Sequence, residues 1–456
     1  MISRRHFLQS SGAALSLSPF ASMGALAADT SGYKALVCVF LFGGCDTHDV
    51  LIGQDVTSYN TWADSRSSIL DAFAASSTPT ARDRTSLLTL NPTNAADYGS
   101  RTFGMPPEMS GLHGLFESGN AAIVPNVGPL IEPTNRQGVV DKTATLPGRL
   151  QSHNDQQSTW QSFGAEGTGT GWGGRILDAV AEASPFSAMS INSNAVFLSG
   201  DQTQPVSVAA SGNVPQVWPT NTLLHGSSTL PGVIRDYYRT SAQTAVNPMM
   251  RDIIAKQASA IEDGEALITA LAGQTLRDSI VISGNSLSEQ LGTIANIIGA
   301  RGTIGASRQV FFASMGGFDT HNSQASTLPV LLERVSEAIT SFQTAIDGAG
   351  LANDVTLFTA SDFGRTLTAN ATGTDHGWGS HHFVVGGAVN GQQIHGDVPV
   401  FDAEHDQDLK RGALIPQISV DQYGAELASW FGLTNSEINM VFPNLGNFDT
   451  NALQLF

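Results

Sequence analysis

The stretch Ala35-Leu36-Val37-Cys38-Val39-Phe40-Leu41-Phe42, which ends at Gly43-Gly44, decides the fold class. It is a continuous apolar run bounded by glycines, and such a run is typical of a strand buried on both faces of a parallel sheet. Further apolar runs predict strands over residues 121–127, 310–315, 355–360 and 383–387.

Helical periodicity alternates with these runs. Amphipathic helices are expected over residues 248–271, 287–298 and 328–345, and the last lies between two predicted strands. This alternation predicts an α/β fold, a three-layer α/β/α sandwich with a mostly parallel central sheet.

Three polar segments interrupt the pattern. Residues 55–100 and 130–150 are rich in Ser, Thr and Asn, so we interpret them as loops or insertions. Residues 200–245 are interpreted as a cap or excursion with short strands that shapes any pocket. The most economical organisation is a single domain over residues 29–456 with these elaborations.

The first 28 residues predict export. Ser3-Arg4-Arg5-His6-Phe7-Leu8-Gln9 matches a twin-arginine signal, and an uncharged stretch follows up to Ala28, with the cleavage-like triplet Ala25-Leu26-Ala27. The alternative is a fortuitous Arg pair in an ordinary N-terminal arm. No later stretch reaches about 18 uninterrupted apolar residues, so we expect no membrane span after signal removal and a periplasmic or secreted protein.

Composition excludes some functions. The chain has 456 residues and a formal net charge of −18, which argues against a nucleic-acid partner because phosphates attract Lys and Arg. Charged residues make up only 14% and glycines number 47, which favours a loop-rich, well-buried α/β enzyme. The two cysteines, Cys38 and Cys45, are expected to be free buried thiols, because an extended strand would hold them apart.

Histidines and aspartates gather in four short clusters, most of them directly after a predicted strand. The clusters are residues 43–49, 152–155, 316–321 and 361–382. In an open α/β sheet the loops after neighbouring strands converge on one crevice, so Asp46, Asp319, Asp362 and His376 are expected to meet. Four such groups need a compensating cation, and Asp/His sets suit Zn, Mn or Fe, with one or two ions bound. The alternative is that these Asp residues cap helices.

The same motifs resemble the DUF1501 family of exported bacterial proteins over nearly the whole mature chain. That family has no settled activity, and its fold resembles the alkaline phosphatase and sulfatase superfamily. The motifs that carry the resemblance are Phe40-Leu41-Phe42-Gly43-Gly44 with Asp46, Gly171-Trp172-Gly173-Gly174-Arg175, Gly317-Phe318-Asp319-Thr320-His321 with Gln324, Ser361-Asp362-Phe363-Gly364-Arg365-Thr366, Gly373-Thr374-Asp375-His376-Gly377-Trp378-Gly379, Val420-Asp421-Gln422-Tyr423 and Trp430-Phe431-Gly432.

The resemblance implies roles for particular residues. Ser152 stands where the superfamily places its nucleophile, ahead of a helix expected to start near Asn154, and His153 and Arg365 are further catalytic candidates. Arg365 either clamps an anionic substrate or bridges to an acid on the sheet edge. The implied metal ligands are Asp46, Asp319, His321, Asp362 and His376, together with His382, since only one of His381 and His382 is expected to enter the site.

Two departures from the superfamily pattern stand out. Phe363 occupies the place of the usual ligand His, and Asp319 and His321 are two residues apart instead of four. Either His376, His381 or His382 has taken over ligation, or one metal is lost, or the scaffold no longer catalyses.

Three functions are therefore compared. The leading hypothesis is a metal-dependent hydrolase of small anionic phosphate or sulfate esters. The alternative is a non-catalytic exported binding or secretion-associated protein that retains the fold and one structural metal. An ordinary serine hydrolase is the weakest, because the sequence has no G-x-S-x-G elbow.

Overall fold

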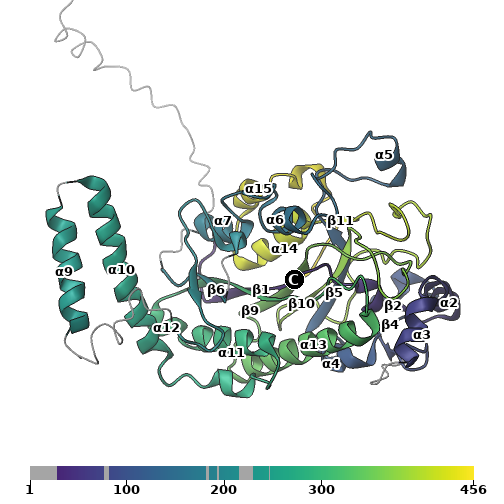
Figure 1. Ribbon diagram of the computed structural model, residues 1–456, viewed down its shortest axis with the longest axis horizontal. Coiled ribbons are helices and arrows are strands. Elements are labelled where there is room, and N and C mark those ends of the chain that lie inside the picture. Colours follow the sequence, from purple (N-terminus) through teal and green to yellow (C-terminus); the bar gives the residue numbers. More distant parts are fainter. Residues whose placement is uncertain (1–27, 76–81, 181–183, 193–194, 215–229, 246) are drawn as a thin grey trace, which may run out of the picture.

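A computed structural model describes residues 28–75, 82–180, 184–192, 195–214, 230–245 and 247–456 (Figure 1). The export signal expected at residues 1–28 lies outside the described residues, apart from Ala28. Among the described residues, no helix combines the length and the apolar character needed to cross a membrane.

One large sheet of eight strands forms the centre of the molecule, in the order β11-β5-β10-β9-β1-β8-β6-β7. All neighbouring pairs are parallel except the two that β10 makes with β9 and β5. The strands are β1 (Lys34–Leu41), β5 (Ala121–Gly128), β6 (Ala188–Ile191), β7 (Val206–Val208), β8 (Arg308–Met315), β9 (Val355–Ser361), β10 (Ser380–Val385) and β11 (Ile418–Ser419). The five strands predicted from apolar runs and the mostly parallel sheet are confirmed.

Helices cover both faces of this sheet (Figure 1). One face packs against α4 (Ser110–Glu117), α11 (Ser286–Gly299) and α13 (Gln324–Gly348). The other packs against α6 (His153–Ser162), α7 (Trp172–Ala179) and α14 (Val420–Phe431), with α15 (Asn435–Val441) outside them. The chain therefore has an α/β architecture with helices above and below a mostly parallel sheet.

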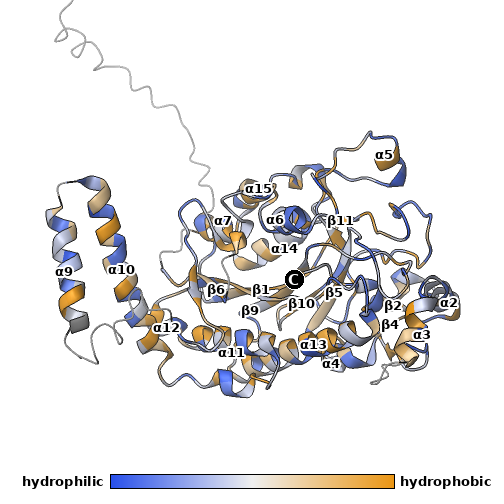
Figure 2. Ribbon diagram, in the orientation of Figure 1, coloured by the Kyte–Doolittle hydropathy of each residue, from blue (hydrophilic) through white to orange (hydrophobic). Residues whose placement is uncertain are grey.

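Strand β1 explains why this sheet is buried on both sides. Ala35, Val37 and Val39 belong to the core on one face, whereas Leu36 and Cys38 belong to the core on the other. Successive strand residues point to opposite faces, so a strand that is apolar throughout supplies both cores (Figure 2). Cys38 and Cys45 are free and buried, as expected.

The polar segment at residues 55–100, interpreted as loops or insertions, contains more regular structure than a loop would. It contains α2 (Val56–Ser65), α3 (Ser67–Ala75) and β3 (Leu88–Thr89), and β3 joins β2 (Ile52–Gly53) and β4 (Phe103–Met105) in a small second sheet. The helices form because Trp62, Ile69 and Phe73 supply a buried face among polar residues. Residues 130–150 contain only the short helix α5 (Arg136–Val140).

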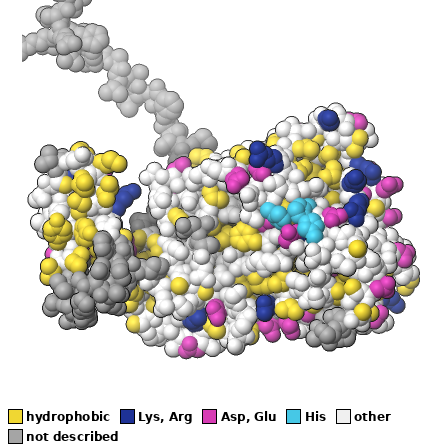
Figure 3. Space-filling view, viewed as in Figure 1, with side chains coloured by type: hydrophobic (Ala, Val, Ile, Leu, Met, Phe, Trp, Pro, Cys, Tyr) yellow, Lys and Arg dark blue, Asp and Glu magenta, His cyan; other side chains and the backbone are white. Residues whose placement is uncertain are grey.

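The segment at residues 200–245 was interpreted as a cap or excursion with short strands. Its described part holds the edge strand β7 and α9 (Leu230–Thr244), which pairs with α10 (Pro248–Leu271) in a helical hairpin. The hairpin projects from one end of the molecule, away from the histidine-rich surface near its centre (Figures 1 and 3). The remaining elements are α12 (Arg301–Ile304) and the short 3-10 helices η1 (Thr47–Asp49), η2 (Ala95–Tyr98), η3 (Pro107–Met109), η4 (Val196–Leu198), η5 (Leu276–Ser279) and η6 (Leu445–Asn447).

Strand direction determines where the polar loops meet. The parallel strands β1, β8 and β9 are neighbours, so their carboxyl ends lie at one edge of the sheet. Strand β10 runs the opposite way, and the loop that precedes it therefore reaches the same edge. The Asp and His clusters follow or precede these ends, as the sequence predicted.

Candidate metal centre

Three histidines and one aspartate converge at this edge of the sheet. Asp319 and His321 follow β8, His376 precedes β10, and His153 is the first residue of α6. Of these, His153, Asp319 and His376 offer ligand atoms that lie within 4.8 Å of one another. Figure 3 shows the histidines as one patch on the molecular surface, with acidic surface at its edge.

The Nε2 atoms of the three rings face a single carboxylate oxygen. Asp319 Oδ1 lies 3.7 Å from Nε2 of His153, 3.2 Å from that of His321 and 3.4 Å from that of His376. The Nε2 atoms of His321 and His376 are 2.8 Å apart. At that distance one ring donates an N–H hydrogen bond to the nitrogen of the other.

The opposite nitrogen of each ring faces an oxygen. The Nδ1–H of His153 donates to Asp362 Oδ2 over 2.7 Å, and that of His376 donates to the Gln151 carbonyl over 2.8 Å. Nδ1 of His321 lies 3.5 Å from Asp375 Oδ1. Metal-binding histidines characteristically donate their second N–H to a carboxylate or a carbonyl, because this fixes the ring and raises its basicity.

These distances fit a small divalent cation. Four ligands at 2.0–2.1 Å from a tetrahedrally bound Zn²⁺ are separated from one another by about 3.3–3.4 Å. The three N–O distances to Asp319, 3.2 to 3.7 Å, lie around that value. The 2.8 Å between the Nε2 atoms of His321 and His376 is shorter than this spacing, so His153, Asp319 and His376 are the group that could hold a metal ion; their side chains are 23–47% exposed.

Arg365 holds the loops of the site together. Its guanidinium donates to the carbonyls of Gly43, Gly44, Phe318 and Thr374 and forms an ion pair with Asp319. The Arg365 side chain is completely buried. The structure therefore favours a bridge from Arg365 to an acid at the sheet edge over a clamp on an anionic substrate.

Gly43 allows the loop after β1 to approach the loop after β8 closely. Its φ is +113°, and a Cβ atom built on it would lie 2.5 Å from the backbone nitrogen of Asp319. Only glycine adopts this conformation without strain and leaves room for the ligand loop.

Phe363, which replaces an expected ligand, is a packing residue. Its fully buried ring lies 4.8 Å from the ring of His153 and 4.6 Å from that of His376, measured between centroids. The rings of the two histidines are themselves 4.5 Å apart. Phe363 thus supports both rings from behind.

The protonation states suit a metal. Burial lowers the pKa of His376, and the nearby charges of Arg365, His153 and His321 lower it further, although the Gln151 carbonyl opposes this. Burial alone would raise the pKa of Asp319, but the hydrogen bond and charge of Arg365 outweigh it and lower the pKa. A neutral imidazole and an ionised carboxylate are the forms that bind metals.

Three predicted ligands are not part of the cluster: Asp362 contacts the far nitrogen of His153, and Asp46 and His382 lie elsewhere. Asp46 is completely buried and forms an ion pair with Arg66, and it also accepts a hydrogen bond from Gln324. Asp319 also pairs with an arginine, but its side chain is 47% exposed, whereas Asp46 lies beneath the surface on which the histidines gather.

His382 is also in the core instead of the cluster. It packs against Trp160 and Tyr423, while His381 points to the other face of β10 and receives a hydrogen bond from the Asn126 N–H. Both histidines are buried because both faces of the sheet are covered, and burial lowers the pKa of each to about 3.

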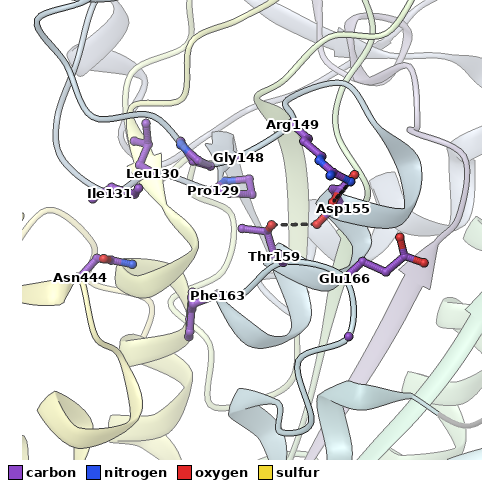
Figure 4. A pocket seen from close by; sticks show the side chains of 14 residues that line it. Pro129, Leu130, Ile131, Gly148, Arg149, Asp155, Thr159, Phe163, Glu166 and Asn444 are labelled. Atoms are coloured by element: carbon purple, nitrogen blue, oxygen red, sulfur yellow. Dashed lines mark hydrogen bonds and ion pairs between the residues drawn. The ribbon is translucent and has the colours of Figure 1, made fainter.

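Ser152 lies directly beside the cluster in the chain but its hydroxyl is turned away. It is the residue before α6, and its Oγ donates to Asp155 Oδ2 over 2.7 Å. Asp155 lines a cavity of about 430 Å³ together with Thr159 of the same helix and Phe163, the residue after it (Figure 4). At 100° per residue, this face of α6 is opposite the face that carries His153.

A comparison with protein families adds one finding. The model of a family described as a protein of unknown function, DUF1501, matches residues 33–439. The chain belongs to the DUF1501 family. No curated protein matches it. Every residue of the metal-site cluster in this DUF1501 protein lies inside the matched range.

Sequence reasoning assigned the DUF1501 site in part. It brought Asp319, His321, Asp362 and His376 to one place, and it flagged His153 as catalytic without assigning it to the metal. The Nδ1 acceptors of His321 and His376, Asp375 and Gln151, were missed. The available signal for His153 was its position at the start of a predicted helix next to a Ser-His-Asn-Asp cluster.

Proposed function

We propose that this DUF1501 protein is an exported metal-dependent hydrolase of phosphate or sulfate esters. One observation carries the proposal: three imidazole Nε2 atoms, with their Nδ1 atoms facing oxygens, point at the Asp319 carboxylate. A divalent cation bound there would polarise the ester and lower the pKa of the attacking hydroxyl. In this proposal His153, Asp319, His321 and His376 hold it.

The start of α6 supports an anionic substrate. The first N–H groups of a helix lack acceptors within the helix, and the helix dipole favours negative charge there. Because His153 is itself the first residue of α6, these N–H groups lie beside the proposed metal ligands. A negatively charged ester oxygen would contact both the N–H groups of α6 and the bound cation.

Ser152 remains the proposed nucleophile. In the structure its hydroxyl donates to Asp155 Oδ2, and a cation bound at the cluster would lower the pKa of this hydroxyl once it faces the cluster. For attack, the side chain has to rotate from Asp155 toward the cluster. Water is the competing nucleophile, and Ser152→Ala separates the two.

Hydrolysis assays test the proposal directly. The purified protein, supplied with Zn²⁺, Mn²⁺ or Fe²⁺, is expected to hydrolyse p-nitrophenyl phosphate or p-nitrophenyl sulfate, and Asp319→Asn to abolish turnover while the fold is retained. Asp278→Asn, which removes an exposed carboxylate elsewhere, serves as the matched control. Absence of turnover with each metal and both esters would contradict the proposal.

A non-catalytic exported binding protein is the second candidate. It is favoured by Phe363 in place of a ligand and by the pairing of Asp46 with Arg66. In that case the metal is structural, and chelation would lower the melting temperature strongly while no ester is hydrolysed. The Arg4-Arg5 motif supports export in either case, and a reporter fused to residues 1–28 tests it.

A further inference from the structure

A second cavity, of about 340 Å³, lies on the face of α6 that carries the metal site. Its lining includes carboxamide side chains on α6 and two aromatic rings. The carboxamides are those of Asn154, Gln157 and Gln161, and the rings are those of Phe42 and Phe312.

One hydrogen-bond chain joins this cavity to the candidate metal centre. Gln157 donates through Nε2 to Asp362 Oδ2 over 2.9 Å, and the same oxygen accepts from Nδ1 of His153 over 2.7 Å. His153 and Gln157 are one helical turn apart and so lie on the same face of α6. Asn154, which lines the cavity, directly follows His153 in α6, so a group held in the cavity would lie next to the histidine cluster.

The hydrogen-bonding groups of the lining indicate which kind of ligand the cavity binds. A carboxamide offers two donors and one acceptor, which matches neighbouring hydroxyls that donate and accept at once. Gln161 is buried, and its Oε1 accepts from the Phe197 N–H over 3.2 Å, which leaves its amide N–H groups as the end available to a ligand.

The two aromatic rings and the few charges of the lining restrict the kind of ligand further. The rings of Phe42 and Phe312 lie 6.4 Å apart, and an aromatic surface packs against the C–H faces of a ring. Glu166 is the only ionisable group among the described residues that line the cavity. Nothing in that lining would attract a second anionic group.

We infer that this cavity binds a neutral, hydroxyl-rich ring, a sugar unit, and that the ester cleaved at the metal centre is carried on that sugar. The second half of this inference rests on the proposed hydrolase function. The first half does not, because a neutral sugar is recognised by the carboxamides and rings without the metal. A cavity of this size is within the range of small-molecule sites.

Binding to the metal-free protein tests the cavity alone. After chelation, saturation-transfer NMR and calorimetry with glucose, galactose, mannose and N-acetylglucosamine are expected to detect binding of at least one. Asn154→Leu and Gln161→Glu should each weaken it by about tenfold or more, because each removes hydrogen bonds to the ligand. Gln161→Glu keeps the acceptor for the Phe197 N–H, and Asn154 is exposed, so both variants are expected to fold.

The matched control is Thr159→Val on the opposite face of α6. Its hydroxyl bonds only the Asp155 carbonyl of its own helix among the described contacts, and it lines the other cavity. Unchanged sugar binding is expected. If none of the four sugars binds, or if Asn154→Leu and Gln161→Glu bind as tightly as the wild type, the sugar site is refuted.

Kinetics test the connection to the metal centre. If the loaded protein hydrolyses esters, sugar phosphates or sulfates should have a lower KM than the p-nitrophenyl ester, and Asn154→Leu should raise only the sugar ester's KM. Sugar binding without hydrolysis of any ester would overturn the hydrolase while the cavity assignment stands. Hydrolysis with no preference for sugar esters would overturn the substrate class proposed here.

Discussion

Substitution of Asp362 by Asn removes the negative charge that contacts Nδ1 of His153, and it leaves all four proposed metal ligands unchanged. Asp362 is completely buried, and its Oδ2 accepts from His153 Nδ1 at 2.7 Å, from Gln157 Nε2 at 2.9 Å and from the Gly43 N–H at 3.2 Å. Asparagine has the same shape but no charge. The His153 ring then loses the carboxylate that orients it and raises the basicity of Nε2.

Loss of such a carboxylate typically weakens metal binding 10- to 100-fold, which corresponds to about 1.4–2.7 kcal/mol. The assay is a competition titration for Zn²⁺ against a chelating dye at pH 7.5, with circular dichroism to verify the fold. Asp375→Asn is the matched control: its carboxylate lies 3.5 Å from His321 Nδ1 and is 37% exposed, so a smaller loss is expected.

A folded Asp362→Asn protein that binds Zn²⁺ as tightly as the wild type would refute the reasoning. It would mean that His153 is not a ligand and that its bond to Asp362 serves only the packing of α6.

Three further changes probe the residues around the centre. Ser152→Ala should abolish ester turnover without changing metal content, and full activity in kinetic assays would exclude Ser152 as the nucleophile. Arg66→Leu should lower the free energy of urea unfolding by about 3–5 kcal/mol, because it leaves the buried Asp46 carboxylate unpaired; a change below 1 kcal/mol would contradict the buried pair. Burial lowers the pKa of His48 to about 3 from 6.5, so its contribution to stability is complete above pH 6.5 and is lost as the pH falls toward 3. At pH 5 this loss is about 2 kcal/mol. His48→Gln should remove it, as measured by urea unfolding at pH 7.5 and pH 5, and an equal loss in both proteins would refute the assignment.

The sheet could be predicted because its central strands are apolar on both faces. A run such as 35–42 has no polar side that could face solvent. Such a strand is stable only in a sheet that helices cover on both faces. The meeting of Asp319 and His376 followed from strand direction in the same way. Helices α2 and α3 were missed because few buried residues, such as Trp62 and Phe73, support them in a polar segment.

The errors in the site have a common physical origin. Sequence shows which residues stand at a strand end, but it does not show which charges are compensated by partners elsewhere. Asp46 stands at the expected place, yet it is completely buried against Arg66, whereas Asp319, which also pairs with an arginine, is 47% exposed. His382 was expected at the site because only one neighbour on a strand faces a given side, but in a doubly covered sheet both sides are core.

Metal content tests the central claim most directly. The mature protein, purified without chelators and incubated with Zn²⁺, Mn²⁺ or Fe²⁺, is analysed for bound metal after dialysis, beside Asp319→Ala and the control Asp278→Asn. One tightly bound ion per chain in the wild type and the control, and none in Asp319→Ala, is the predicted result. A folded wild-type protein that retains no ion, or an Asp319→Ala protein that retains as much as the wild type, would contradict the account.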